Sequence, residues 1–214
     1  PLVLSLVGDF THKIEDSSLN IYNYLTSSHR LTIQKPFVDS NFSLKGVKGV
    51  LDDSNARQAR LVLAWQAPSV HYRDEFFKTK LLSALLSAGM SSLYFSILRE
   101  EKGYAYDVSS SYPSLPNPSR FLSTIGLDYG NVDECIQDIL NIHASLDKKL
   151  SQQSLSVALN IINTSFLTLK ESVSSLSINY CTMHHLGLGV NALDTYVDTL
   201  SSISLSEVVE SAHE

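Results

Sequence analysis

Arg99 and Tyr106 lie seven residues apart in the stretch "SILREEKGYAY", on either side of Gly103. A guanidinium and a phenol hydroxyl both donate hydrogen bonds to carbonyl oxygens, the guanidinium through a rigid fork. In a cleft that excludes water, such donors also stabilise an oxyanion, and each contributes roughly 10²–10³-fold in rate. The spacing leaves two interpretations open. Either the pair binds the backbone of a peptide, or Arg99 caps a helix and Tyr106 packs in a sheet.

The elements around this pair predict how the two side chains approach each other. Residues 91–100 carry apolar side chains at helical spacing, with Leu93 and Ile97 on one side of the buried stripe. Gly103 is placed to end that helix, and the alternation over 104–112 predicts a strand. The turn at the glycine brings the helix end beside the start of the strand, so both polar tips can reach one patch.

The remaining pattern predicts a single α+β domain over residues 1–214. Strands are expected at 2–7, 45–52, 58–66 and 119–128, and helices at 12–27, 72–86, 151–173, 174–186, 191–201, near Asn131 and from Ser204. Ile14, Ile21 and Leu25 mark the expected inner face of the first helix. Because strands alternate with helices early and helices dominate late, the order favours a two-layer sandwich, a mainly antiparallel sheet covered by helices on one side.

The composition excludes several classes of partner. The 214 residues have 43% apolar side chains, a net charge of -6 and a pI near 5.6, whereas nucleic acids and anionic membranes need a basic surface. No apolar run approaches the length of a membrane span. Cys135 and Cys181 lack metal-ligand spacing and are interpreted as free core thiols, with a single disulfide as the alternative.

Known metal and nucleophile motifs are absent from the sequence. Zinc peptidases hold the metal with converging ligands such as His-x-x-Glu-His, and none of the seven histidines fits that pattern. His184 and His185 are adjacent, so on a helix they diverge by roughly 100° and chelate one ion poorly. His143 is interpreted as a hydrogen-bonded core histidine. With no metal site, cofactor site or nucleophile elbow, the chain alone is predicted to be inactive.

The block "AGMSSLYFSILREEKGYAYDVSSSY", residues 88–112, resembles the signature region of the C-terminal domain of pitrilysin/insulinase-family zinc metallopeptidases. Three weaker matches follow the same order along the chain: "LVGDF" at 6–10, "QARLVLAWQAPS" at 58–69 and "SSISLSEVVESAHE" at 201–214. Leu93 and Tyr104 depart from the common family pattern, but neither belongs to the Arg99–Tyr106 pair.

The resemblance implies a fold and a function. Enzymes of this family are clamshells of two similar halves, the N-terminal one carrying an inverted zinc motif. The C-terminal half contributes an arginine and a tyrosine that reach the substrate backbone. On this sequence the pair is Arg99, for a carbonyl beside the scissile bond, and Tyr106, for the oxyanion. The implied fold is the processing-peptidase-like sandwich, whose sheet lines the chamber, with zinc in the full-length enzyme or in a partner subunit.

These implications define the expected partners. The chain starts at Pro1, directly in a predicted strand, and is interpreted as the C-terminal half of a larger peptidase. It is expected to bind an N-terminal zinc-binding half or a zinc-carrying subunit, and a peptide substrate. An isolated half exposes its chamber face, which predicts self-association as a homodimer. The alternatives are a zinc-less partner subunit or structural core protein of the family, and an unrelated α+β binding module.

Overall fold

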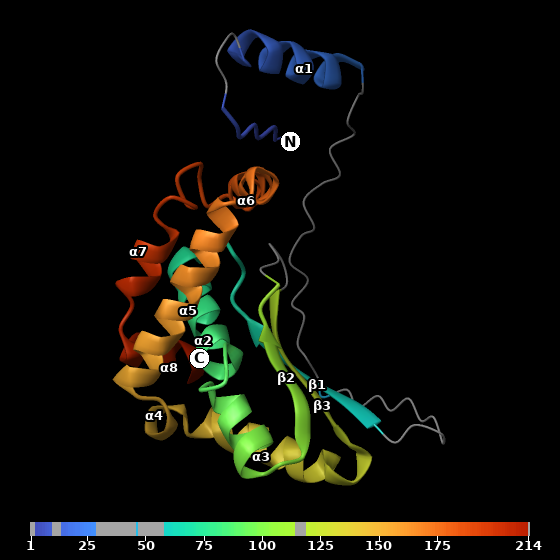
Figure 1. The fold of residues 1–214 in the computed structure, drawn as a ribbon, viewed down its shortest axis with the longest axis vertical. Coiled ribbons are helices and arrows are strands. Elements are labelled where there is room, and N and C mark those ends of the chain that lie inside the picture. The colour runs from blue at the N-terminus through green and yellow to red at the C-terminus, as the bar shows by residue number, and fades with distance from the viewer. Residues whose placement is uncertain (1–2, 10–13, 29–45, 47–57, 114–118, 214) are drawn as a thin grey trace.

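The computed structural model describes residues 3–9, 14–28, 46, 58–113 and 119–213. In chain order the elements are α1 Ile14–Ser28, β1 Gln58–Ala67, α2 Arg73–Ser87, the π-helix η1 Phe95–Glu101, β2 Ala105–Ser111, β3 Ser119–Asp128, the short 3₁₀ helix η2 Tyr129–Asn131, α3 Val132–Ala144, α4 Leu146–Lys149, α5 Gln152–Lys170, α6 Val173–His185, α7 Tyr196–Ser201 and α8 Leu205–His213. Figure 1 shows α2, α5, α7 and α8 gathered on one side of the sheet, while α1 lies apart from this body.

The described strands form an antiparallel sheet in the order β1-β3-β2. β1 pairs with β3 along its full length, from Gln58 opposite Asp128 to Ala67 opposite Ser119. The strands predicted at 58–66 and 119–128 are therefore confirmed, and the one predicted at 104–112 is observed as Ala105–Ser111. The prediction of a mainly antiparallel sheet with a helical layer is confirmed.

The two faces of the sheet have different surroundings. Along β1 the residues that point toward the helices, such as Leu61 and Leu63, are partly buried, and the alternate residues, such as Arg60 and Val62, are exposed. We call the second surface the open face of the sheet, because no helix covers it among the described residues. The core lies on the other side, and its largest fully buried side chains include Tyr94, Phe76, Phe77, Leu81, Leu86, Leu98, Ile125, Leu127, Ile139, Ile142, Leu146 and Leu200.

Serine side chains cap two of the helices in the helical layer. The Ser151 side chain accepts from the backbone N–H of Ser154, and the Ser154 hydroxyl accepts in return, which caps α5. α5 ends at Lys170, and the side chain of Ser172 caps α6. The predicted helices 151–173 and 174–186 are thus both observed, but the first ends three residues earlier and the second begins one residue earlier than predicted, because the Ser172 side chain caps α6.

Two predictions at the N-terminal end need correction. Residues 3–7 form no strand. The Ser5 carbonyl accepts a hydrogen bond from the Ser177 hydroxyl on α6 at 2.8 Å, so its partner is a helix side chain and not a strand. The first helix is observed as α1, but Ile21 is 47% exposed, so the predicted inner face is wrong at that position. The strand predicted at 45–52 lies outside the described residues except for Gly46.

Cys135 and Cys181 are free thiols, which answers the question that the sequence left open. Cys135 is buried, and burial raises the pKa of its thiol to about 11. Within the described part of the chain, none of the helices combines the length and the apolar character that crossing a bilayer requires.

Candidate functional site

The segment that carries Arg99 is a π-helix, not the α-helix predicted for residues 91–100. It spans Phe95–Glu101, and its wider turns are visible in the bond from the Lys102 N–H to the Ile97 carbonyl, five residues back, at 2.9 Å. Gly103 follows with φ 72°, a left-handed conformation that favours glycine, and the chain then enters β2. Such wide turns are rare and frequently occur at functional sites.

Arg99 lies at the exposed end of this π-helix and is held from two sides. Its guanidinium carbon lies 4.9 Å from the centre of the Phe95 ring, a cation–π arrangement one helical turn away. Its Nη1 donates to the main-chain carbonyl of Tyr106 at 3.0 Å. The structure thus brings Arg99 to the backbone of Tyr106 across the glycine turn. A guanidinium has five N–H donors, and this bond uses one of them.

Tyr106 is the extra residue of a β-bulge. Ala105 pairs with Leu127 and Asp107 pairs with Gly126, so residue 106 has no place in the register between β2 and β3. The bulge directs both Tyr106 and Asp107 to the open face, above Gly126. A Cβ on that glycine would lie 3.1 Å from Cε2 of Tyr106 and 3.2 Å from Cβ of Asp107. The absence of a side chain on β3 therefore makes room for the tyrosine ring.

The Tyr106 hydroxyl donates to the carbonyl of Leu127 on β3 at 2.7 Å. Partial burial and the nearby Asp128 raise the pKa of this phenol, so it keeps its proton near neutral pH. The side chain is 39% exposed, which leaves part of the ring open to solvent. Both polar groups that the sequence singled out are thus accessible, and each is engaged with a main-chain carbonyl of the sheet region.

An ion pair that sequence reasoning missed lies next to them. Arg60 on β1 donates to Asp107 at 3.1 Å across the row that contains Gly126. Both side chains are well exposed, so solvent screening keeps the contribution of this pair to stability small. The alternation of β1 places Arg60 on the open face. Its pairing with Asp107 depends on the bulge, which shifts the pairing of β2 with β3 by one residue. No residue pattern in the sequence predicts this bulge.

Tyr104, one of the two departures from the family pattern, is buried on the other side of the sheet. Its hydroxyl donates to the Asp138 carboxylate on α3, and Lys102 bridges Asp138 and Glu134 at 3.3 and 3.1 Å. These contacts anchor the turn after the π-helix to α3. They fix the position of the Arg99–Tyr106 segment without touching either residue.

The described residues hold no group of three or more His, Cys, Asp or Glu side chains that could bind a metal ion. His184 and His185 lie in the last turn of α6, outside any such cluster.

The model of the peptidase M16 inactive domain family matches residues 2–162 of the sequence. The chain belongs to this family. The match includes residues 88–112 and confirms the resemblance drawn from that block. The family's description names an inactive domain of the peptidases.

Known relatives agree with this assignment. An uncharacterized zinc protease of Rickettsia felis is 18% identical over 220 residues, covering 99% of this chain and 50% of that protein. A protease structure from Helicobacter pylori has a TM-score of 0.79 at 19% identity, covering 97% of this chain and 50% of that one. A peptidase M16 inactive domain from Pseudomonas fluorescens has a TM-score of 0.64 at 18% identity, covering 72% and 37%. The structural likenesses show the fold, and this chain spans about half the length of its curated relative.

Proposed function

We propose that residues 1–214 form one domain, the zinc-free, substrate-holding half of a zinc metalloendopeptidase. The family match and the double length of the relatives support this proposal. In this proposal the catalytic metal is bound by another half of the protein or by a partner subunit. The present chain supplies hydrogen-bond donors for the peptide.

The observation that carries the proposal is a pair of donors at the start of β2: Tyr106 on the open face and Arg99 at the exposed end of η1. Arg99 has one N–H bonded to the Tyr106 carbonyl, so its fork can donate a further bond to a substrate carbonyl. Tyr106 reaches the substrate when its hydroxyl proton turns from the Leu127 carbonyl to the developing oxyanion. The ring pivots above Gly126 in that motion. In a closed chamber the low dielectric strengthens both bonds.

The test of this role is Tyr106→Phe in the full-length enzyme. Loss of a donor that acts in the transition state is expected to lower kcat roughly 10²-fold with little change in KM. Tyr129→Phe, a change to an exposed tyrosine just after β3, is the matched control and is expected to leave kcat unchanged. Unchanged turnover of Tyr106→Phe would remove the tyrosine from the mechanism.

A second candidate function is a non-catalytic partner subunit or structural core protein of the family. It is favoured by the observation that both side chains already donate within the chain, Arg99 to the Tyr106 carbonyl and Tyr106 to the Leu127 carbonyl. In that case a full-length protein would lack His-x-x-Glu-His, and Tyr106→Phe would leave peptide binding intact.

Self-association through the open face stays a prediction, to be checked by sedimentation of this chain.

A further inference from the structure

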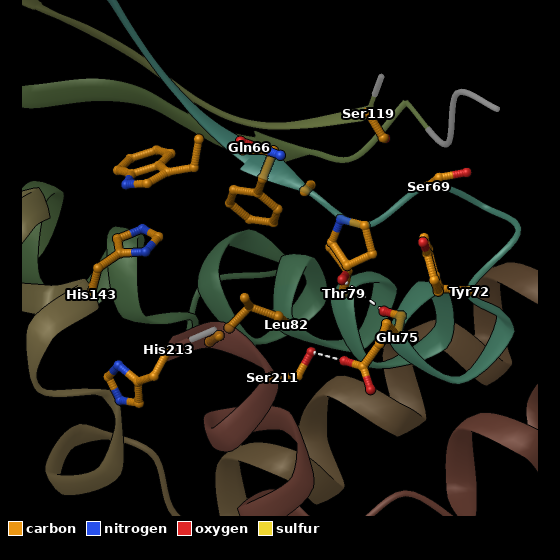
Figure 2. A pocket seen from close by; sticks show the side chains of 15 residues that line it. Gln66, Ser69, Tyr72, Glu75, Thr79, Leu82, Ser119, His143, Ser211 and His213 are labelled. Atoms are coloured by element: carbon orange, nitrogen blue, oxygen red, sulfur yellow. Dashed lines mark hydrogen bonds between the residues drawn. The ribbon is translucent and has the colours of Figure 1, made fainter. Parts of the chain in front are cut away.

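A cavity of about 600 Å³ lies on the helix side of the sheet, between the end of β1 and helices α2, α3 and α8 (Figure 2). Small-molecule sites have volumes of about 300–1,000 Å³, so the cavity has the size of a ligand site. The open face with Tyr106 is the opposite surface of the same sheet, and neither Arg99 nor Tyr106 lines the cavity. The proposed function therefore makes no use of this cavity.

One wall of the cavity is aromatic and uncharged. Trp65 and His143 stack with ring centres 4.4 Å apart, and Phe121 meets the Trp65 ring edge-on at 6.3 Å. Burial, with a smaller effect of His213, lowers the pKa of His143 to about 4, so the imidazole is neutral at physiological pH. Its Nε2 is 2.5 Å from the Tyr94 hydroxyl, which fixes the ring. This wall suits a flat apolar group.

The other side of the cavity carries the carboxylate of Glu75. Glu75 on α2 accepts from Lys78 at 2.7 Å and from the Ser211 hydroxyl on α8, and these bonds lower the pKa of its carboxyl. Each carboxylate oxygen can accept a second bond. Lys78 also interacts with the charges of Asp74 and Glu207, and none of these three residues lines the cavity. No lysine or arginine is among the described residues that line the cavity.

A buried hydroxyl adds a further polar group. Ser119 lines the cavity and is 5% exposed. Its hydroxyl interacts with the phenol oxygen of Tyr112, whose own proton goes to the Pro68 carbonyl. A hydroxyl oxygen has two lone pairs, so Ser119 can also accept a bond from a polar group in the cavity.

We propose that this cavity binds a small aromatic cation, an aryl-alkyl ammonium, with the ring against Trp65 and the ammonium at Glu75. The aromatic wall accounts for the ring. The Glu75 carboxylate, whose partner Lys78 lies outside the lining and whose oxygens can accept further bonds, accounts for the ammonium. A carboxylate ligand would meet the Glu75 carboxylate, and a purely apolar ligand would leave that side of the cavity unused.

The sequence supplies its own reporter for the test, because Trp65 is the only tryptophan in the chain. The 214-residue chain is titrated with 2-phenylethylammonium while Trp65 emission is followed. 2-Phenylethanol, with the same ring and no charge, and 3-phenylpropionate, an anion, are titrated in parallel. The expected result is saturable binding of the ammonium, at least about 10-fold tighter than the alcohol, and no binding of the anion.

Two variants locate the charge. Glu75→Gln is expected to abolish the preference for the ammonium over the alcohol, while Glu101→Gln, an exposed carboxylate outside the cavity, keeps it. Should Glu75→Gln unfold, the three probes on the unaltered chain still decide the question. Equal affinity for the ammonium and the alcohol, or no saturable change with any probe, would overturn the proposal.

Discussion

The two faces of the central sheet differ in what their side chains do. On the helix side, β3 contributes Ile125 and Leu127, both fully buried, to a continuous core. On the open face the same strand contributes Thr124 and Gly126, and the neighbouring strands carry polar and charged groups. Every second residue of this strand therefore packs in the core, and the residues between them lie on the open face.

Successive residues of a strand point to opposite faces of the sheet, so the residues that stabilise the fold and those of the candidate site lie on different faces. Buried apolar groups on one face contribute most of the folding free energy per residue. Exposed ion pairs and single tyrosines on the other contribute little, so that face is free to vary or to bind. Variants placed on opposite faces at neighbouring positions test this separation directly.

The largest expected difference is between Ile125→Ala and Val62→Ala. Ile125 has no exposed surface, so removing its side chain leaves a cavity and is expected to cost about 2–5 kcal/mol of unfolding free energy. Val62 lies on the open face and is 53% exposed, so its truncation is expected to cost about 0.5 kcal/mol or less. Urea unfolding of both variants measures the difference, and equal losses would contradict the separation of the faces.

A pH effect is expected from the helix side. The pKa of His143 is lowered from 6.5 to about 4 in the folded chain, so between these values the unfolded chain binds more protons. The free energy of unfolding is therefore expected to fall as the pH falls from 6.5, by about 2 kcal/mol at pH 5, with no further loss from this group below pH 4.

The measurement is urea unfolding at pH 7 and pH 5. His143→Gln is expected to remove this share of the pH dependence, because glutamine does not titrate. His71→Gln, a change to an exposed histidine, is the matched control and is expected to keep it. The same pH dependence in His143→Gln and the unaltered chain would show that the buried imidazole is not the cause.

The smallest effect concerns the open face itself. Gly126→Ala places a Cβ 3.1 Å from the Tyr106 ring and is expected to cost about 1–2 kcal/mol, because the ring must shift. In a Tyr106→Ala background the cost is expected to fall by about 1 kcal/mol, since the ring is gone. Gly130→Ala, with no atom within 4 Å of its Cβ, is the control. A double-mutant cycle by urea unfolding measures the coupling, and additive losses would contradict the contact.

Much of the fold could be predicted from local pattern. The strand at 119–128 was delimited by alternation and by the prolines before it, and its bounds agree with the structure. The strand predicted at 2–7 is wrong, because an apolar run does not specify its partner and Ser177 of α6 binds the Ser5 carbonyl. Hydrophobic periodicity thus predicts a strand or helix well where residues such as these prolines also mark one of its ends.

The candidate site was predicted only in part. Arg99 and Tyr106 were found from their types, their spacing and the resemblance of residues 88–112. The bulge at Tyr106 and the bond to Leu127 were not, because they depend on strand register, which a single residue shifts. The cavity was missed as well: Trp65 and Glu75 belong to different elements, and only the packing of α2, α3 and α8 against β1 brings their side chains around one space.

The π-helix has a consequence for how this segment tolerates change in length. Each hydrogen-bonded loop of a π-helix contains one residue more than that of an α-helix, so a one-residue deletion between Phe95 and Glu101 can convert a π turn into an ordinary α turn without breaking the helix. A deletion between Phe95 and Arg99 would change the position of the guanidinium relative to the Phe95 ring. Differences in length among relatives in this segment therefore carry information about the direction in which the arginine points.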